Sequence, residues 1–418
     1  MSVPIKYRKL GDFPEYYSGR RKAPVLTIFI AGNHEAISHS WELYYGGWVA
    51  PNIYYLGAAN VLRFGPIRIA GISGIWSEPD YNKSHIERLP FNHKDNKSFY
   101  HIREFDVRRL LLIREQVDIG FSHDWPRGIE RDGDEEAFWR LKPFLKQAGL
   151  DGALGNPAVT FVLDRLRPLH WFSAHLHCHF TALRRHEAVA TDSWGSGQKT
   201  RPVSTRPQST ALMEEADETH STGMEADTRA APPVQATAAN KDASGEVKIQ
   251  PSTASIFNTE TQFLALATIG RRSTSTALRL EYDPEWLAIT RVFHQCLTTG
   301  DRNAKPPVDE GEITYAEMID KERAWVDEHV VAQGKLAIPE NFVFTAPPHN
   351  PGDPEAVSWQ PEEYTNPQTA AFCGLLQIKD LWDATSQERE ARKRDAQPRQ
   401  GNRDGQGSRG DSDRRSGA

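Results

Sequence analysis

The chain has 418 residues, of which 38% are apolar, and it carries a formal net charge of -6 at pH 7. Such a chain can hold one large domain or two with tails, and its acidic balance argues against overall electrostatic attraction to nucleic acid. The three cysteines are widely spaced and no apolar run approaches the roughly 18 residues of a membrane span, so a disulfide framework and a membrane protein are both excluded, and we expect a reducing intracellular compartment.

The first 180 residues predict a layered α/β domain, because short apolar runs alternate with helical patterns. Expected strands are Val25–Ile30, Ile53–Leu56, Ile67–Ile75, Val117–Phe121 and Leu169–Ala174. Expected helices are Val107–Arg114 and Pro157–Leu166, the second with Asn156 as its N-cap.

The composition changes after this region. Residues 188–252 are rich in Ser, Thr, Ala, Pro and Gly and predict a disordered insert. Residues 257–269 then indicate a strand, and residues 278–297 a strand followed by a helix. Residues 372–378 indicate one more strand, and the charged segment from 386 onward predicts an unfolded tail.

Three of the expected strands end in a turn that carries histidine. PVLTIFI ends at Asn33-His34, VDIGF at Ser122-His123-Asp124, and LHWFSA at His175-Leu176-His177. Strand ends of an α/β sheet gather ligands, so the three turns are expected to converge. His175 and His177 would face the same way on an extended segment, and neutral imidazole and amide groups suit Mn, Fe or Zn. Any one of these histidines alone would be read as a hydrogen-bonded structural group, but three together favour a metal site.

The order GNHE, then SHD, then HLH is similar to the back half of the calcineurin-like metallophosphoesterase pattern. The chain more specifically resembles the lariat debranching enzyme family, through YGGWVAPNIYYLG (45–57), GISGIW (71–76), DIGFSHDWP (118–126), WFSAHLHCHF (171–180) and TQFLALATIG (261–270). The resemblance implies an α/β fold: a layered β-sandwich flanked by helices, plus a small α+β C-terminal domain. The implied division is a metallophosphoesterase domain at 1–187, the insert at 188–252, the C-terminal domain at 253–385 and the tail at 386–418.

This resemblance implies roles for particular residues. Asn33, His123, His175 and His177 would be ligands of one or two divalent ions, Mn, Fe or Zn, and His34 would act on the phosphate. The implied reaction is hydrolysis of the 2′–5′ phosphodiester bond at the branch point of excised intron lariat RNA. Implied partners are the branched RNA and spliceosome-associated proteins, with no membrane and no DNA, and the implied location is the nucleus.

Residues 128–156 stand where the family has its lariat-recognition loop. Trp139, Arg140, Lys142 and Lys146 offer stacking and phosphate contacts for single-stranded RNA. The alternative is an ordinary amphipathic helix whose apolar stripe is Phe138, Leu141 and Leu145. His85, His93 and His101 lie in a polar loop and are expected to be solvated.

The family's site also has front-half ligands, a Cys-or-Asp-x-His motif and a GDF motif. Residues 1–32 contain no His and no Cys, and Gly11-Asp12-Phe13 follows YRKL rather than a buried strand. We interpret Asp12 as a look-alike in a helix that leads to YYSG. The chain as given is therefore expected to lack the first strands and to be inactive. The alternatives are a non-catalytic relic that binds RNA or the spliceosome, and another phosphoesterase of the superfamily.

Overall fold

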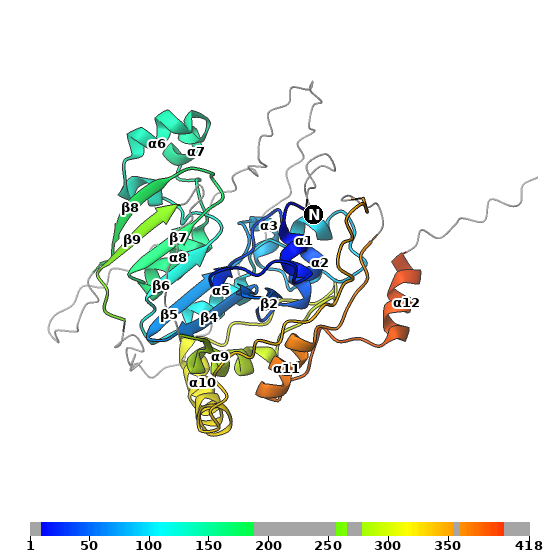
Figure 1. Ribbon diagram of the computed structural model, residues 1–418. Coiled ribbons are helices and arrows are strands. Elements are labelled where there is room, and N and C mark those ends of the chain that lie inside the picture. Colours follow the sequence, from blue (N-terminus) through cyan, green and yellow to red (C-terminus); the bar gives the residue numbers. More distant parts are fainter. Residues whose placement is uncertain (1–9, 188–255, 266–277, 355–359, 397–418) are drawn as a thin grey trace, which may run out of the picture.

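The computed structural model describes residues 10–187, 256–265, 278–354 and 360–396 (Figure 1). These residues form a mixed α/β structure with two β-sheets. The strands are β1 (Thr27–Phe29), β2 (Gly47–Ala50), β3 (Ile53–Tyr55), β4 (Ala59–Phe64), β5 (Ile67–Ile72), β6 (Ile119–Ser122), β7 (His170–Ser173), β8 (Phe180–Arg185), β9 (Glu260–Ala265) and β10 (Leu280–Tyr282).

Helices surround the two sheets. The α-helices are α1 (Phe13–Tyr17), α2 (Ile37–Glu42), α3 (Glu78–Tyr81), α4 (Asp95–Ser98), α5 (Glu104–Leu111), α6 (Glu135–Leu141), α7 (Lys146–Leu150), α8 (Pro157–Leu166), α9 (Pro284–His294), α10 (Glu312–Val326), α11 (Pro367–Leu376) and α12 (Ser386–Ala396). Two 3₁₀ turns, η2 (Ile129–Asp132) and η3 (Pro143–Leu145), and a π-helical turn, η4 (Asp327–Val331), complete the elements. Among the described residues, no helix combines the length and the apolarity needed to cross a bilayer.

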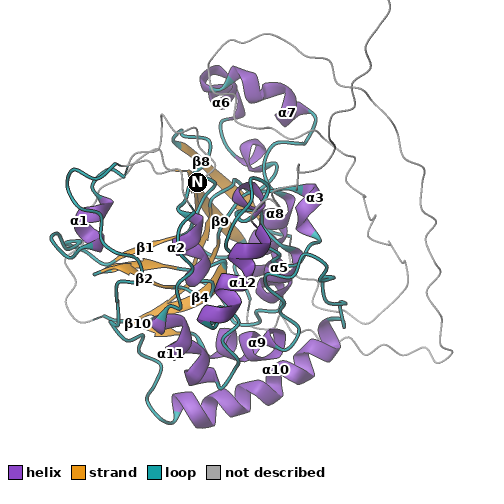
Figure 2. Ribbon diagram, turned by 90° about the vertical axis from the view of Figure 1, so that its right-hand side faces the viewer, coloured by secondary structure: helices purple, strands orange, loops and turns teal. Residues whose placement is uncertain are grey.

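The larger sheet has the order β10-β4-β5-β6-β7-β9-β8, and the smaller one has the order β1-β3-β2. β5, β6, β7 and β9 run parallel to one another, so their carboxyl ends lie along one edge. The two sheets pack closely at Gly71 of β5 and Ile30, which follows β1. A Cβ added at Gly71 would come within 3.0 Å of the Ile30 side chain. Figure 2 shows β1 and β2 to the left of β9, a strand of the larger sheet, and α5 and α8 to its right.

The predicted elements of the first 180 residues are confirmed, with different bounds for all but α8: the strands are mostly shorter, and the helix expected at Val107–Arg114 is α5, Glu104–Leu111. β1, β3, β5, β6 and β7 lie within or beside the five expected strands, and α8 has its predicted bounds. The side chain of Asn156 accepts hydrogen bonds from the backbone N–H groups of Ala158 and Val159, as expected of an N-cap. β2, β4 and β8 were not predicted.

Two predictions for the second half of the chain are wrong. Residues 372–378 belong mostly to helix α11, which begins after an Asn366 N-cap and a proline at its first turn. Residues 386–396 form helix α12 rather than an unfolded tail. The predicted insert at 188–252 and the rest of the tail, 397–418, lie outside the described residues.

Helix α12 is attached to the protein through one buried carboxylate. Glu363 is 6% exposed and accepts hydrogen bonds from Arg88 at 3.0 Å and from Arg392 at 2.7 Å. Arg389 lies 3.6 Å from the same carboxylate. A helix in which seven of eleven residues are charged therefore holds its place partly because two of its arginines share a buried partner with Arg88 of the N-terminal half.

The larger sheet crosses the predicted domain boundary. β9 lies between β7 and β8, and β10 pairs with β4 at the sheet's edge. Residues that the sequence places in the C-terminal domain thus complete the sheet of the first domain. An ion cluster joins the same parts, because Arg68 of β5 donates to Asp283 at 2.6 Å and to Glu285 at 2.8 Å, and all three side chains are buried.

At the β2 edge of the smaller sheet, a side chain rather than another strand forms hydrogen bonds with the backbone. The backbone N–H of Trp48 donates to Oε1 of Gln368 at 2.7 Å, and Nε2 of Gln368 donates to the carbonyl of Trp48 at 2.9 Å. Both residues are buried. The amide of Gln368 therefore supplies the donor and the acceptor that a neighbouring peptide group would supply.

Candidate active site

The three histidine-bearing loops converge, as the sequence predicts. Nε2 of His123, which follows β6, lies 3.1 Å from Oδ1 of Asn33, which follows β1. The same Nε2 lies 3.2 Å from Nδ1 of His175, which follows β7. Three atoms that could bind a metal ion, from loops that follow three separate strands, thus lie close together.

The loop after β7 differs from the expected extended segment. His175 and His177 have φ values of 52° and 48°, so both residues adopt the left-handed conformation. The turn is held because the N–H of Ala174 donates to the carbonyl of His123 at 3.1 Å and the indole of Trp125 donates to the carbonyl of Ala174 at 2.9 Å. Non-glycine residues in this conformation cluster at functional sites, where the surrounding structure holds the strain.

The imidazole of His123 is neutral in this environment. Burial, with a smaller contribution from the neighbouring His175, His34 and His177, lowers its pKa to about 3. His34 and His177, both exposed, are therefore close enough to His123 to act on its charge. Neutral imidazole is the form that binds metal ions, so His123 has the protonation state that a metal ligand needs.

Gly32 is required by this geometry. A Cβ on Gly32 would lie 2.6 Å from Nδ1 of His123, a separation that real side chains do not show. The N–H of Gly32 donates to Oε1 of Glu35 at 3.2 Å, which fixes the turn. Burial raises the pKa of the Glu35 carboxyl, while this hydrogen bond and the nearby His34 oppose the rise.

The buried Asp124 lies next to the site and contacts His175. Its Oδ2 accepts hydrogen bonds from the N–H of Trp76 at 2.7 Å and from Nδ2 of Asn156 at 3.2 Å, and its Oδ1 lies 3.6 Å from Nε2 of His175. Burial raises the pKa of Asp124, and the adjacent His175 opposes that rise. Carboxylates in this position orient the imidazoles of metal sites. Asp124 is not among the predicted site residues; its place directly after a ligand-type histidine was the available signal.

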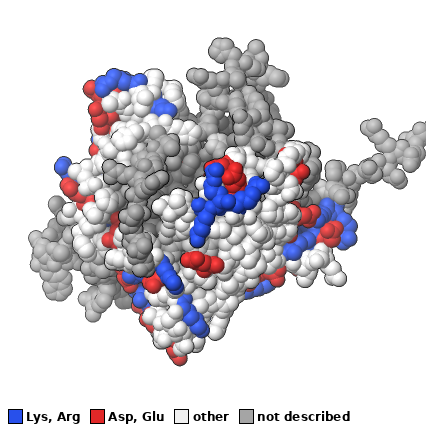
Figure 3. Space-filling model, viewed as in Figure 1, with Lys and Arg blue, Asp and Glu red and all other residues white. Residues whose placement is uncertain are grey.

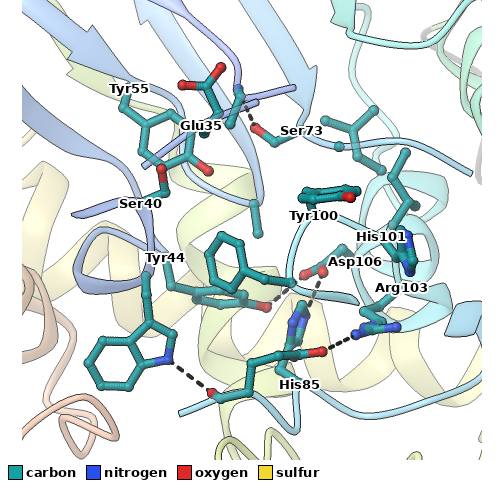
Figure 4. Close-up of a pocket in the computed structure, with 18 of the residues that line it drawn as sticks. Glu35, Ser40, Tyr44, Tyr55, Ser73, His85, Tyr100, His101, Arg103 and Asp106 are labelled. Carbon is teal, nitrogen blue, oxygen red and sulfur yellow. Dashed lines mark hydrogen bonds and ion pairs between the residues drawn. The ribbon is translucent and has the colours of Figure 1, made fainter. Parts of the chain in front are cut away.

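A cavity of about 50 Å³ adjoins the loop of residues 31–35 (Figure 4). Figure 4 shows Tyr44 and His85 pointing toward Asp106, to which they are bonded at 2.6 Å and 2.8 Å. The side chain of His101 pairs with Asp80 at 2.6 Å. The expectation of solvation is therefore wrong for His85 and His101, whose mostly buried side chains are hydrogen-bonded to Asp106 and Asp80, while His93 is exposed as expected.

The predicted RNA-binding residues differ in exposure. Arg140 and Lys146 are exposed and Lys142 is half-buried. Trp139 is only 8% exposed and packs against Phe138 and Gly149, so it is not accessible for stacking with a base. The alternative apolar stripe holds for the buried Phe138 and Leu145 but is wrong for Leu141, which is 58% exposed.

The look-alike Asp12 does not join the histidine loops. It directly precedes α1 rather than lying within it, and its exposed carboxylate pairs with Arg21 at 3.0 Å. Within the described ranges, no three side chains of the His, Cys, Asp or Glu type are arranged to hold a metal ion. The imidazole and amide groups fit a divalent ion in their chemistry, but the set depends on the amide oxygen of Asn33 and contains no carboxylate.

Comparison with known proteins agrees with this geometry. The family profile described as "Lariat debranching enzyme, C-terminal domain" matches residues 258–381. The lariat debranching enzyme of Schizosaccharomyces pombe is 40% identical, with 91% of this chain and 87% of that protein aligned. Those of Danio rerio and Homo sapiens are 38% and 35% identical; 91% of this chain aligns with each, over 58% and 60% of their lengths. The chain belongs to the lariat debranching enzyme family.

Proposed function

We propose that the reaction of this protein is hydrolysis of the 2′–5′ phosphodiester bond at the branch point of excised intron lariat RNA; that the chain as given is inactive stays a prediction, which the experiment below also tests. Membership of the family supports the substrate, since the relatives are named for debranching lariats. The structural observation that carries the proposal is the convergence of Asn33, His123 and His175 within hydrogen-bond distance. We assign the architecture to the calcineurin-like metallophosphoesterase type, with action in the nucleus and beside spliceosome-associated proteins.

Asn33, His123, His175 and His177 are the residues that would hold a divalent ion, which we propose to be Mn, Fe or Zn. Bound there, the ion would offset negative charge on the phosphoryl oxygens and lower the pKa of a water nucleophile. The exposed imidazole of His34 stands beside this set. Its role would be to donate a hydrogen bond to the phosphoryl group, or a proton to the departing 2′ oxygen.

A second candidate is a protein that binds branched RNA without cutting it. The observation that favours it is the absence, among the residues that the structure describes, of three ionisable side chains arranged as a metal site. Such a protein would keep the RNA-facing surfaces and lose turnover.

A branched RNA with a label on the 2′ arm separates the two candidates. The full chain is incubated with this RNA and Mn²⁺ or Fe²⁺, beside a linear RNA of the same sequence. Release of the 2′ arm with the linear RNA intact supports hydrolysis, and His34→Ala is then expected to abolish release while binding stays nearly unchanged. Tight binding of the branched RNA with no release, at every metal tried, supports the second candidate. No binding and no release would refute both.

A further inference from the structure

A cleft of about 310 Å³ lies between the π-helical turn η4, the loop that follows it and the carboxyl end of helix α11. This volume is at the lower end of the range of pockets that bind small molecules. Figures 1 and 2 both place α10 and α11 at the lower end of the molecule and α6 and α7 at the upper end. The cleft is separate from the histidine loops, since its lining residues are Glu328, His329, Gln333, Lys335, Gly374, Leu375 and Gln377.

One wall of the cleft is an imidazole that already takes part in a stack. The ring of His329 lies parallel to the indole of Trp325, with ring centres 4.4 Å apart and an angle of 6° between the planes. Its Nδ1 donates to the carbonyl of Trp325 at 3.0 Å, which fixes the orientation of the ring. One face and one edge of the imidazole are thus occupied. The other face and the Nε2 edge account for the 39% of the side chain that is exposed.

The two walls of the cleft are joined through one arginine. Cζ of Arg291, in α9, lies 3.5 Å from the centre of the Trp325 ring on which His329 stacks. The same guanidinium donates to the carbonyl of Leu376, the last residue of α11. The wall that carries His329 and the wall that carries Gln377 therefore keep a fixed separation. A site that is already formed loses less conformational entropy when a ligand binds.

The remaining lining groups can bind the edge of a planar ligand. Gln377 follows α11 in the left-handed conformation, with φ of 51°, and its N–H donates to the carbonyl of Gly374 at 3.2 Å. Its carboxamide and that of Gln333 can each donate and accept hydrogen bonds. Glu328 adds a group that only accepts and Lys335 a group that only donates. Both kinds of hydrogen-bonding partner are therefore available beside the imidazole face.

The charges around the cleft are mixed. Its lining contains one cation, Lys335, and one anion, Glu328, and both side chains are exposed. Figure 3 shows Lys, Arg, Asp and Glu atoms together on the lower part of the molecule, where Figure 1 places α10. Such a surface does not attract a polyphosphate strongly. Leu375 alone offers too little apolar surface to hold an apolar side chain, so the lining fits a planar ring with donors and acceptors on its edge.

We propose that this cleft binds one unpaired nucleobase, which stacks on the free face of His329 while Gln333 and Gln377 hydrogen-bond to its edge. The carboxylate of Glu328 accepts from an exocyclic amino group, which adenine, guanine and cytosine carry. Uracil is disfavoured, because its N3–H stands between two carbonyl oxygens that repel a carboxylate. Lys335 pairs with the phosphate of the same nucleotide. The base belongs either to a free mononucleotide or to an RNA strand, since both present the same ring.

Isothermal titration of the full chain with AMP, CMP and UMP, in the presence of a chelator, tests the site. CMP and UMP form a matched pair, because they differ only at the amino group and N3. CMP is expected to bind more tightly than UMP, and Glu328→Gln is expected to reduce that difference. A labelled single-stranded oligonucleotide of adenosines, measured by fluorescence anisotropy, distinguishes an RNA strand from a free nucleotide as the source of the base.

Two substitutions of one residue separate stacking from a structural effect. His329→Ala is expected to weaken the binding of AMP by roughly 5- to 100-fold, the range typical of base–aromatic stacking. His329→Phe keeps a flat ring and is expected to bind nearly as the wild type does. His93→Ala is the matched control, because His93 is an exposed histidine outside the cleft. Circular dichroism checks that all three variants fold.

The stacking site is overturned by equal binding of AMP to the wild type and His329→Ala, or by equal losses in His329→Ala and His93→Ala. It is also overturned by a wild-type chain that binds neither AMP nor the oligonucleotide. Equal binding of CMP and UMP refutes the role of Glu328. The inference does not rest on the proposed function, because nucleotide binding is measured without cleavage. Loss of AMP binding in His329→Ala therefore supports the cleft even where branched RNA is not cut.

Discussion

Oδ1 of Asn33 lies 3.1 Å from Nε2 of His123, although ninety residues separate the two in sequence. The contact joins the end of a strand in the smaller sheet to the end of a strand in the larger one. It is possible only because Gly32 leaves room for the imidazole, which would otherwise meet a Cβ at 2.6 Å.

Gly32→Ala is therefore expected to displace His123 and to lower the affinity for Mn²⁺ by roughly tenfold or more, as misoriented ligands do. Isothermal titration of the full chain measures the affinity. Gly374→Ala is the control, since nothing lies within 4 Å of a Cβ at that helical position. The control should leave metal binding unchanged and stabilise the fold by about 0.5–1 kcal/mol. Unaltered affinity in Gly32→Ala would show that His123 does not bind the ion.

Asp124→Asn is expected to lower metal affinity by about 10- to 100-fold, the range found when the carboxylate behind a histidine ligand is changed. The asparagine can still accept from Trp76 or Asn156, but it places no negative charge 3.6 Å from Nε2 of His175. Asp12→Asn serves as the control, because Asp12 is exposed and pairs with Arg21. Equal effects from the two substitutions would argue against a positioning role for Asp124.

Glu42 is expected to make stability depend on pH. Burial raises its pKa to about 7, with hydrogen bonds from Thr345 and Asn366 and the charge of Arg389 opposing the rise. Between about pH 4.5 and 7 the folded state keeps the proton and the unfolded state releases it, so the free energy of unfolding falls as pH rises. The loss should reach about 3 kcal/mol by pH 7.5.

Glu42→Gln removes this titration and keeps an acceptor for Asn366. Urea unfolding at pH 5 and at pH 7.5 is expected to show a smaller decline for the variant than for the wild type. Parallel pH dependences of the two proteins would mean that Glu42 is ionised throughout.

Gln368→Ala is expected to lower the free energy of unfolding by about 2–4 kcal/mol, since it leaves the buried N–H and carbonyl of Trp48 without partners. Gln360 makes the same pair of bonds with the backbone of Phe91 but is itself exposed. Gln360→Ala should lower the free energy of unfolding by less than Gln368→Ala does, because water can replace the hydrogen bonds of the exposed Gln360 amide. Chemical denaturation measures the free energy of unfolding of the two variants. Equal decreases in the two would show that the burial of Gln368 does not make its hydrogen bonds more stabilising than those of Gln360.

The strand ends and helix α9 could be predicted from the sequence, whereas α11 and α12 were predicted wrongly. Hydrophobic runs that stop at polar turns mark β1, β6 and β7, so the meeting of Asn33, His123 and His175 was predictable. The run at 372–378 misled because a short apolar stretch does not distinguish a strand from a buried helix. The Asn366-Pro367 pair was the missed signal, since the Asn156-Pro157 pair had identified α8 correctly.

Other features depend on long-range contacts that no local pattern carries. The order of charges in α12 is typical of a solvated tail, and its structure depends on Glu363, a residue outside the helix. The inward direction of Trp139 follows from the position of Gly149, and the left-handed turns at His175 and His177 follow from contacts with the loop after β6.

The pairing of Gln368 with Trp48 also bears on self-association. Exposed backbone groups at the rim of a sheet are templates on which strands of other molecules can assemble into aggregates. At Trp48 those groups are already occupied by an amide that cannot extend the ladder, so no further strand can be added there. One glutamine side chain thus protects the folded protein against intermolecular β-pairing at Trp48, even at high concentration.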